Sequence, residues 1–592
     1  MPAANFLNDH YRKKARRRTR VVALFCAVWM LGIIVRLVQL QVFGHTEAEA
    51  QVVEQNQGRM DIQPRRGTIH DRQGRILARS LPAGSIYYKP NPADSLPARI
   101  EPIRRLAGPL GLTAKDMERI EGQIRANTRQ ICLKRKIDPA AFRKIEPDAA
   151  ASKVNRRLRI EYREETKRFY PLGPRAAQVL GGVNNLGQGV SGIELKFNAV
   201  LQGKKGQAFS LRDAKQHEYH NEVIEEPEDG RDIHLTLDET IQFYAQSGIQ
   251  KAVAETGAAW GTAIVSDPKT GDILAMATAP GFDPNEYPAE PEADFNRAVR
   301  HMYEPGSTFK IVTAAAALEN RVVTLADTFD CRKGSIEVAG GAIHDHQQMG
   351  VLSFAEVITN SSNVGTIMVG QRLSEDQLYR MINAFGFGRR TGIELPAEAQ
   401  GKLYPVDQWS RRSQSSLSIG YEIQVTPIQV LQAMNIVAKR GQLVPLRIVK
   451  FVQGSRPRAA ETTATAVLSP DAGEKLVAIL KRAVAEGTGE AARPEGFDVA
   501  GKTGTTQIYD PLIKAYSTKR HIASFVGFVP IDEPALSIIV VLDDPKTEEQ
   551  YGGQLAAPVF REIAGRTLRY LGVRPYRVPA LLASRPAEKG RP

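Results

Sequence analysis

Three short motifs in this sequence combine the residue types that serine-based acyl transfer requires. They occupy residues 307–310 (STFK), 361–363 (SSN) and 502–505 (KTGT). A serine hydroxyl is a weak nucleophile unless a base stands beside it. A lysine can be that base only when burial or a neighbouring cation lowers its pKa from about 10.4. We therefore predict that Ser307 is the nucleophile and that Lys310 accepts its proton.

The apolar run after the first motif favours a catalytic role for Ser307. Residues 311–318 read IVTAAAAL, so Ser307 is expected to open a helix and Lys310 to return to the same face one turn later. The positive end of the helix dipole and free backbone N–H groups would stabilise an oxyanion there. Taken alone, Ser307 would be an N-cap and Lys310 a surface lysine. The other two motifs decide against that interpretation.

The second motif follows an apolar segment, residues 354–358, that is typical of a short helix. From the end of that helix its side chains can reach into a cleft. Ser361 is predicted to pass a proton to a leaving amine, and Asn363 to hold a substrate amide. By itself the motif would be an ordinary polar loop.

The third motif is predicted to bind the end of a peptide. Gly504 on a strand lets another backbone come close, so an extended peptide could add to that strand. Lys502 and the hydroxyls of Thr503 and Thr505 would then bind its terminal carboxylate. Lys502 is also the second cation that would lower the pKa of Lys310.

A second copy of both lysine motifs occurs at residues 266–271 (SDPKTG). Pro268 disfavours the helical conformation at Asp267, and the flanking residues are typical of strands, so this copy is predicted to be a hairpin turn. The residue that follows it, Asp272, would repel a carboxylate. We therefore do not expect Ser266 to be a nucleophile.

No metal or cofactor is predicted. Residues 344–346 (HDH) invite a zinc interpretation, but consecutive side chains on an extended segment point to opposite faces and do not converge on one ion. The chain has three cysteines and no C-x-x-C pair. Cys26 lies in an apolar segment, and Cys132 and Cys331 are far apart in the sequence and are expected to be unpaired.

The N-terminus has the pattern of a membrane anchor. Seven positive charges and one negative charge lie between Asp9 and Arg20, and the largely apolar segment 21–43 follows. A helix of that length can cross a hydrocarbon layer of about 30 Å. The preceding positive charges predict a cytoplasmic N-terminus and an exported remainder. A cleaved signal peptide is the alternative, although its best site, residues 48–50 (AEA), lies well past the apolar run. Nucleic-acid binding by the basic tail is not expected, because the tail continues directly into the span.

Length and composition predict a globular protein of two or three domains. The acidic segment 225–230 (EEPEDG) is typical of a solvated linker and is the expected main boundary. The predicted layout is a basic tail at 1–20, a transmembrane helix at 21–43, a first domain at 44–230, a second domain at 231–575 and a disordered tail at 576–592.

The second domain is predicted to be α+β, with an antiparallel sheet covered by helices. Strands and helices alternate in groups along it rather than one by one. The expected elements are a hairpin at 261–279, helices between 307 and 440, strands at 525–529 and 536–542, and a final helix at 558–571.

The order and spacing of the three motifs resemble those of penicillin-binding proteins and serine β-lactamases. Ser362 stands where class A β-lactamases have aspartate, and the Glu-x-x-Leu-Asn element of those enzymes is missing from the sequence. Both differences favour a transpeptidase. Further segments are similar to class B penicillin-binding proteins, namely residues 66–78, 189–194, 267–277, 425–429 and 551–560.

The resemblance implies a serine β-lactamase-like transpeptidase domain on an elongated N-terminal pedestal, or dimerisation, domain. It implies a D,D-transpeptidase of the bacterial inner membrane that cross-links peptidoglycan stem peptides through a Ser307 acyl-enzyme, releases D-Ala and is inhibited by β-lactams. The backbone N–H groups of Ser307 and Thr505 would form the oxyanion hole.

A short cytoplasmic tail and a compact pedestal look most like the division-type (septal, FtsI-like) enzymes. The implied partners are lipid II-derived strands, a SEDS-class polymerase (FtsW) and other divisome proteins. An elongation-type enzyme, a non-enzymatic β-lactam sensor and a catalytically silent scaffold are the alternatives.

Overall fold

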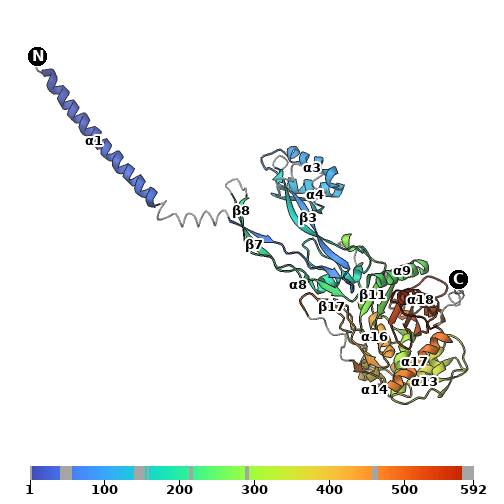
Figure 1. Ribbon diagram of the computed structural model, residues 1–592. Coiled ribbons are helices and arrows are strands. Elements are labelled where there is room, and N and C mark those ends of the chain that lie inside the picture. The colour runs from blue at the N-terminus through green and yellow to red at the C-terminus, as the bar shows by residue number, and fades with distance from the viewer. Residues whose placement is uncertain are drawn as a thin grey trace, which may run out of the picture. The chain divides into compact units, whose positions relative to one another are not determined.

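The computed structural model describes residues 3–39, 57–138, 154–155, 159–212, 218–286, 292–455 and 464–576 (Figure 1). Contacts within the chain separate it into two units. One comprises residues 1–64 and 204–228, and the other residues 65–203 and 229–592. The predicted C-terminal tail lies outside the described residues, except for Tyr576.

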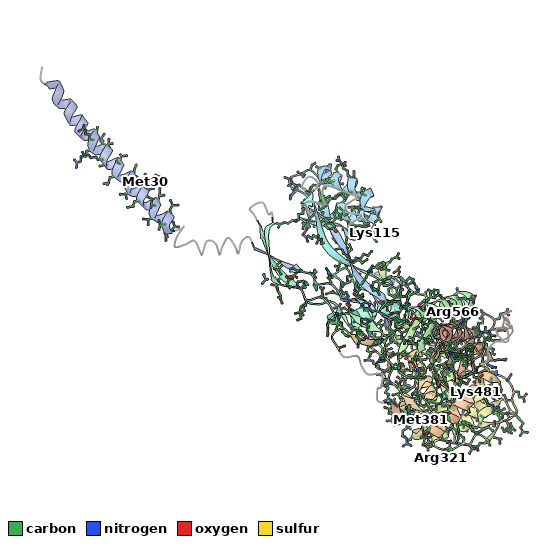
Figure 2. The ribbon with its side chains drawn as sticks, viewed as in Figure 1. Met30, Lys115, Arg321, Met381, Lys481 and Arg566 are labelled. Carbon is green, nitrogen blue, oxygen red and sulfur yellow. The ribbon has the colours of Figure 1, made fainter. Side chains whose placement is uncertain are left out.

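The first unit contains the predicted membrane helix. Helix α1 spans Ala3–Val38, and its segment Ala15–Val38 has a mean hydropathy of 2.6, long and apolar enough to cross a membrane. The side chains of that segment, Met30 among them, are exposed (Figure 2). The end of the predicted span, residues 40–43, lies outside the described residues. The unit also holds a three-stranded antiparallel sheet in the order β1 (Gln57–Ile62), β7 (Gly206–Arg212) and β8 (Glu218–Glu225).

The second unit begins with a larger sheet in the order β17-β9-β2-β3-β6-β5, in which β4 also pairs with β3. Helices α3 (Leu96–Leu110) and α4 (Ala114–Arg125) share an apolar core with β3, β4 and β6. The strands are β2 (Ile69–His70), β3 (Ile76–Tyr88), β4 (Ile131–Ile137), β5 (Val154–Asn155), β6 (Ile160–Phe169), β9 (Ile233–Leu235) and β17 (Val449–Val452).

A buried ion-pair cluster joins two of the segments that resemble the class B pedestal. Glu194 is fully buried, and its carboxylate accepts hydrogen bonds from Arg66 Nε at 2.6 Å and from Arg168 Nε at 2.7 Å. Arg168 also donates to the carbonyl of Gly67 at 2.8 Å. Because an unpaired buried charge is strongly destabilising, the three side chains depend on one another. Residues 66–78 and 189–194 are thereby held together although they are far apart in the sequence.

The predicted α+β fold with an antiparallel sheet is confirmed in the remainder of the unit. The five-stranded sheet has the order β11-β10-β21-β20-β19, and all its neighbouring strands are antiparallel. The 261–279 hairpin forms as β10 and β11, and β19 lies at the sheet edge. The strands are β10 (Trp260–Ser266), β11 (Ile273–Ala279), β19 (Ala500–Asp510), β20 (Ala515–Val529) and β21 (Leu536–Asp543).

Helices cover both faces of this sheet, because successive side chains on a strand point to opposite faces. Val540 packs in a core with helices α9 (Glu239–Thr256) and α18 (Gly552–Tyr570). The next residue back, Ile539, packs in a second core with α16 (Pro427–Ala438) and most of α17 (Pro470–Ala485) (Figure 1). Further helices are α10 (Arg297–Arg300), α11 (Lys310–Glu319), α12 (Phe354–Thr359), α13 (Asn363–Gly370), α14 (Glu375–Ala384) and α15 (Ser413–Ser418).

The start of the final helix differs from the prediction. Helix α18 begins at Gly552, so Pro558 lies inside the helix instead of at its first turn. Proline inside a helix removes one backbone hydrogen bond. Burial of Ala556 and Ala557 in the core around Phe525 outweighs that cost, since packing of an apolar face is the main source of helix stability.

Candidate active site

Ser307 lies in a tight turn that leads into α11. The turn is a 3-10 helix, η4, spanning Gly306–Phe309, and the α-helix begins at Lys310. Ser307 therefore precedes the α-helix by one turn and does not open it. In a 3-10 helix residues three apart are eclipsed, so Ser307 and Lys310 still lie on the same side. Ser307 is half-buried, whereas Lys310 is fully buried.

The second motif is held in an uncommon backbone conformation between α12 and α13. Ser361 has φ of 60°, in the left-handed region that non-glycine residues seldom adopt. Ser362 is the N-cap of α13, and its hydroxyl accepts a hydrogen bond from Gly365 N at 2.9 Å. Strained residues of this kind persist where the surrounding structure fixes them, often at functional sites.

The third motif lies on the edge strand β19, against the turn that carries Ser307. A Cβ atom on Gly504 would come within 2.4 Å of Ser524 Oγ and 2.9 Å of Thr308 Cγ2. Only glycine lets the 3-10 turn approach the strand this closely. Among the described strands only β20 pairs with β19, and the addition of an extended peptide to its other edge stays a prediction.

Neighbouring elements fix both threonine hydroxyls of this motif. Thr503 Oγ1 lies 2.6 Å from the hydroxyl of Thr488, and Thr505 Oγ1 accepts a hydrogen bond from Gly552 N at 3.1 Å. Gly552 is the first residue of α18. The hydroxyls are thus held in place before any ligand binds.

Two buried lysines join the three motifs through Ser361. Lys310 Nζ donates to the Ser361 carbonyl at 2.6 Å and to Asn363 Oδ1 at 2.7 Å. Lys502 Nζ donates to Ser361 Oγ at 2.8 Å, and Lys310 Nζ lies 3.4 Å from the same atom. Segments more than 50 and 140 residues apart therefore meet at one hydroxyl. Among the described contacts, Ser307 Oγ makes no hydrogen bond, which leaves it free for a substrate.

Burial lowers the pKa of both lysines. The pKa of Lys310 is well below its usual value because the side chain is buried and because Lys502 is close, while Asp345 opposes the shift. Burial lowers the pKa of Lys502 to about 7. A lysine whose pKa is lowered in this way is neutral over a wider pH range, as a base for Ser307 requires.

Asn363, which is predicted to hold a substrate amide, is hydrogen-bonded to other protein groups in the structure. Its Oδ1 accepts from Lys310, and its Nδ2 donates to the His344 carbonyl at 2.9 Å. Both ends of the amide therefore have protein partners. This arrangement orients Lys310, a role that the spacing of the motif did not suggest.

Sequence reasoning missed Asp345, which appears there only as the middle of the HDH triplet. Its carboxylate lies at the N-terminus of α13 and accepts hydrogen bonds from the Asn363 backbone N–H and from Ser362 Oγ, the latter at 2.8 Å. No sequence signal links residues 345 and 363, because the contact arises only from tertiary packing.

The second copy of the lysine motifs forms no such site. Ser266 is buried on β10, and its hydroxyl donates to Asn435 Oδ1 at 3.2 Å. Lys269 is exposed in the turn between β10 and β11. The hairpin that Pro268 predicts is therefore confirmed.

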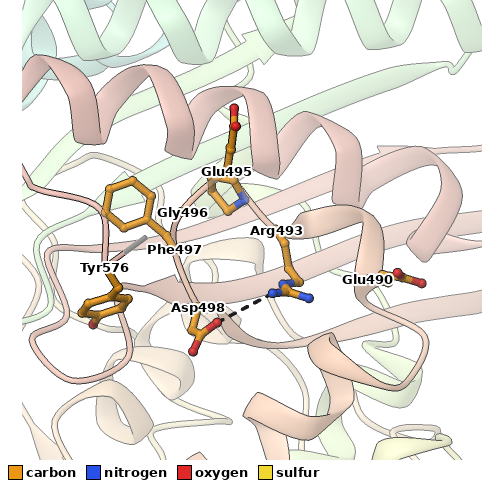
Figure 3. Close-up of a pocket in the computed structure, with 8 residues that line it drawn as sticks. Glu490, Arg493, Glu495, Gly496, Phe497, Asp498 and Tyr576 are labelled. Carbon is orange, nitrogen blue, oxygen red and sulfur yellow. Dashed lines mark ion pairs between the residues drawn. The ribbon is translucent and has the colours of Figure 1, made fainter. Parts of the chain in front are cut away.

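A separate pocket of about 320 Å³ lies next to the N-terminal end of β19 and is lined by none of the motif residues (Figure 3). Arg493 and Asp498 form an ion pair of 3.8 Å on its wall, and Phe497 and Tyr576 supply aromatic rings. Its other lining residues are Glu490, Pro494, Glu495 and Gly496.

Comparison with known proteins places both parts of the chain in one family. Residues 261–565 match the penicillin binding protein transpeptidase domain, and residues 61–235 match the penicillin-binding protein dimerisation domain. The chain is 32% identical over 575 residues to Stage V sporulation protein D of Bacillus subtilis (strain 168), covering 95% of this chain and 86% of the relative. It is 30% identical over 528 residues to peptidoglycan D,D-transpeptidase FtsI of Escherichia coli (strain K12), covering 86% and 84%.

A solved relative has the same fold. Penicillin binding protein 3 from Mycobacterium tuberculosis, complexed with aztreonam, is 28% identical with a TM-score of 0.66, and the match covers 87% of this chain and 98% of that one. The buried lysine pair around Ser361 thus lies in a domain whose family is defined by transpeptidation. The chain belongs to the class B penicillin-binding proteins and is a serine-type peptidoglycan D,D-transpeptidase.

Proposed function

We propose that the enzyme works through an acyl-enzyme on Ser307. Neutral Lys310 accepts the hydroxyl proton while Ser307 Oγ attacks the carbonyl carbon between the two D-Ala residues of a stem peptide. The backbone N–H groups of Ser307 and Thr505 stabilise the resulting oxyanion. The amide bond then breaks, and the terminal D-Ala leaves as an amine that receives its proton through Ser361.

The second half of the reaction reverses the roles. An amine of a neighbouring stem peptide attacks the ester carbonyl, loses its proton to the Lys310–Ser361 pair and releases Ser307 with its hydroxyl restored. The hydrogen bonds of Lys310 and Lys502 to Ser361 are the single observation that carries this proposal. They connect Lys310 with Ser361, the residue proposed to pass the proton to the leaving amine.

Substrate binding is assigned to the edge strand. The stem peptide would pair with β19, with its terminal carboxylate at Lys502 and at the hydroxyls of Thr503 and Thr505. β-Lactams would acylate Ser307 in the same position. The aztreonam complex of the M. tuberculosis relative supports this expectation.

The glycine before the nucleophile offers a test of this geometry. Gly306 has φ of 53°, and a Cβ there would lie 2.2 Å from Thr506 Oγ1. Gly306→Ala should therefore displace Ser307 and lower the rate of penicillin acylation about 10- to 100-fold, measured with a fluorescent penicillin. Gly565→Ala is the control, since its nearest neighbour would be Pro494 Cβ at 3.6 Å. Equal rates for the two variants would contradict the assignment.

We also propose that the enzyme is anchored in the inner membrane by residues 21–43, with residues 1–20 in the cytoplasm and the rest outside. Residues 44–230 would form the pedestal, residues 231–575 the catalytic domain and residues 576–592 a disordered tail. The exposed apolar side chains of α1 support the anchor.

Within the family we propose a role in cell division, with a SEDS-class polymerase (FtsW) as membrane partner. Similarity to the E. coli transpeptidase named FtsI supports this assignment. Depletion of the protein from its bacterium should give filaments without septa, scored by microscopy with a fluorescent D-amino acid. Round cells would instead identify an elongation enzyme. Normal division with Ser307→Ala as the sole copy would indicate a scaffold or sensor.

A further inference from the structure

We propose that Asp345 is a positioning residue for transpeptidation, which holds Ser361 and Asn363 in reach of Lys310. The inference rests on the proposed role of Ser307 and Lys310. It concerns a residue outside all three motifs, in the segment between β14 (Gly341–His344) and β15 (Val351–Ser353).

The carboxylate of Asp345 spans the first turn of α13. Its Oδ1 accepts from the backbone N–H groups of Asn363 and Val364, the second at 3.1 Å. Its Oδ2 accepts from the Ser362 hydroxyl at 2.8 Å. The first N–H groups of a helix have no partner within the helix, and a negative charge is favourable there. One side chain therefore contacts the second residue of the SSN motif through its hydroxyl and the third through its backbone N–H.

Asp345 is itself held by a hairpin. Its backbone N–H donates to the Gly334 carbonyl at 2.9 Å, and the preceding residue, His344, pairs with Ser335 of β13 (Ser335–Val338). The carbonyl of His344 accepts from Asn363 Nδ2 at 2.9 Å. The end of this hairpin thus holds both the main chain and the side chain of Asn363.

Asp345 affects the two lysines through Ser361 and Asn363, which are their hydrogen-bond partners. Ser361 has a left-handed backbone conformation. Its carbonyl accepts a hydrogen bond from Lys310 and its hydroxyl one from Lys502. Both contacts depend on Asp345, which holds the next residue, Ser362. Asn363 Oδ1 lies 2.7 Å from Lys310 Nζ because Nδ2 is tied to His344. Releasing the carboxylate would let both partners of Lys310 move.

Asp345 also acts on Lys310 by charge. It raises the pKa of Lys310, against burial and the repulsion of Lys502. The other titratable groups that face this region are His346, whose pKa is lowered by burial and by both lysines, and the buried Cys331, whose pKa is raised by burial. Removing the carboxylate would leave Lys310 neutral at lower pH.

The test compares Asp345→Asn and Asp345→Glu in the full-length protein in detergent. The second-order rate of acylation by a fluorescent penicillin is measured across neutral pH. For Asp345→Asn we expect a rate about 10- to 100-fold lower at the optimum. We also expect the acid side of its pH profile to move to lower pH. Asp345→Glu displaces the carboxylate by one methylene, so its acylation rate should fall. Because it keeps the negative charge, the acid limb of its pH profile should stay in place.

The control is Asp330→Asn, which removes an exposed carboxylate that bonds Arg332 at 2.7 Å. It should leave both rate and profile unchanged. A merely structural role would lower the rate and the unfolding temperature of Asp345→Asn without moving its acid limb, and would overturn the inference. If Asp345→Asn does not fold, Asp345→Glu decides: a wild-type rate contradicts the inference, and a lower rate at an unchanged unfolding temperature supports it.

The result also separates this inference from the proposed function. If Ser307→Ala is still labelled, the proposed function fails. If Ser307→Ala is not labelled while Asp345→Asn reacts like the wild type, only the role of Asp345 is wrong.

Discussion

Replacing Ser307 with alanine is expected to abolish penicillin labelling and to lower the transpeptidation rate by about 10³-fold or more. The acyl-enzyme is an ester of Ser307 Oγ, so it cannot form once that oxygen is removed. The fold should be unaffected, since Ser307 is half-buried and its hydroxyl makes no hydrogen bond among the described contacts. Labelling is measured with a fluorescent penicillin, and turnover by release of D-Ala from a synthetic stem peptide.

The chain supplies a matched control in its second S-x-x-K sequence. Ser266→Ala removes a buried hydroxyl whose partner is Asn435, away from the lysine pair. It should keep wild-type labelling even if it unfolds at a slightly lower temperature. Labelling that survives in Ser307→Ala, or that is lost in Ser266→Ala, would show that the nucleophile has been assigned to the wrong serine.

Replacing Lys310 is expected to have the second largest effect. Lys310→Arg keeps the positive charge, but a guanidinium is always protonated and cannot accept a proton from Ser307. Lys310→Met keeps similar length without a base. Both should lower the acylation rate about 10²- to 10⁴-fold, the usual contribution of a general base. Lys269→Met, in the exposed turn after β10, is the control and should react like the wild type.

The two lysines also predict the pH dependence of the wild-type enzyme. Lys310 must be neutral, so acylation is lost as pH falls through its lowered pKa. Lys502 must be charged to bind a carboxylate, so second-order acylation is lost as pH rises past its pKa of about 7. A bound carboxylate favours the charged lysine, so the alkaline limb should move to higher pH once substrate is bound. A pH profile of the acylation rate that only rises, with a pKa near that of free lysine, would contradict the assignment of Lys310 as the base.

Local chemistry made much of the site predictable from the sequence. Pro268 separated the false motif from the true one, because its effect on Asp267 is steric and needs no tertiary information. The hairpin at 261–279 and the strands at 525–529 and 536–542 followed from apolar runs and turn residues. The order and spacing of the three motifs along the chain then indicated the family, and the family implied that the motifs meet at one site.

Long-range packing explains what the sequence did not predict. Asp345 contacts Asn363 because the β13–β14 hairpin folds against the start of α13. No local sequence pattern predicts this contact. Helix α18 starts at Gly552 because that glycine fits against the carbonyls of Ser524 and Gly504, at 2.2 and 2.3 Å from a would-be Cβ. The predicted start at residue 558 is therefore wrong, since contacts with the sheet determine where the helix begins.

Mapping the penicillin adduct tests the central claim most directly. After labelling of the wild-type protein, digestion with trypsin should give a peptide of residues 301–310, HMYEPGSTFK, that carries the drug. Fragmentation in the mass spectrometer should place the added mass on Ser307. An adduct on any other peptide, or on Thr308 within this one, would contradict the account in which the buried lysines activate Ser307.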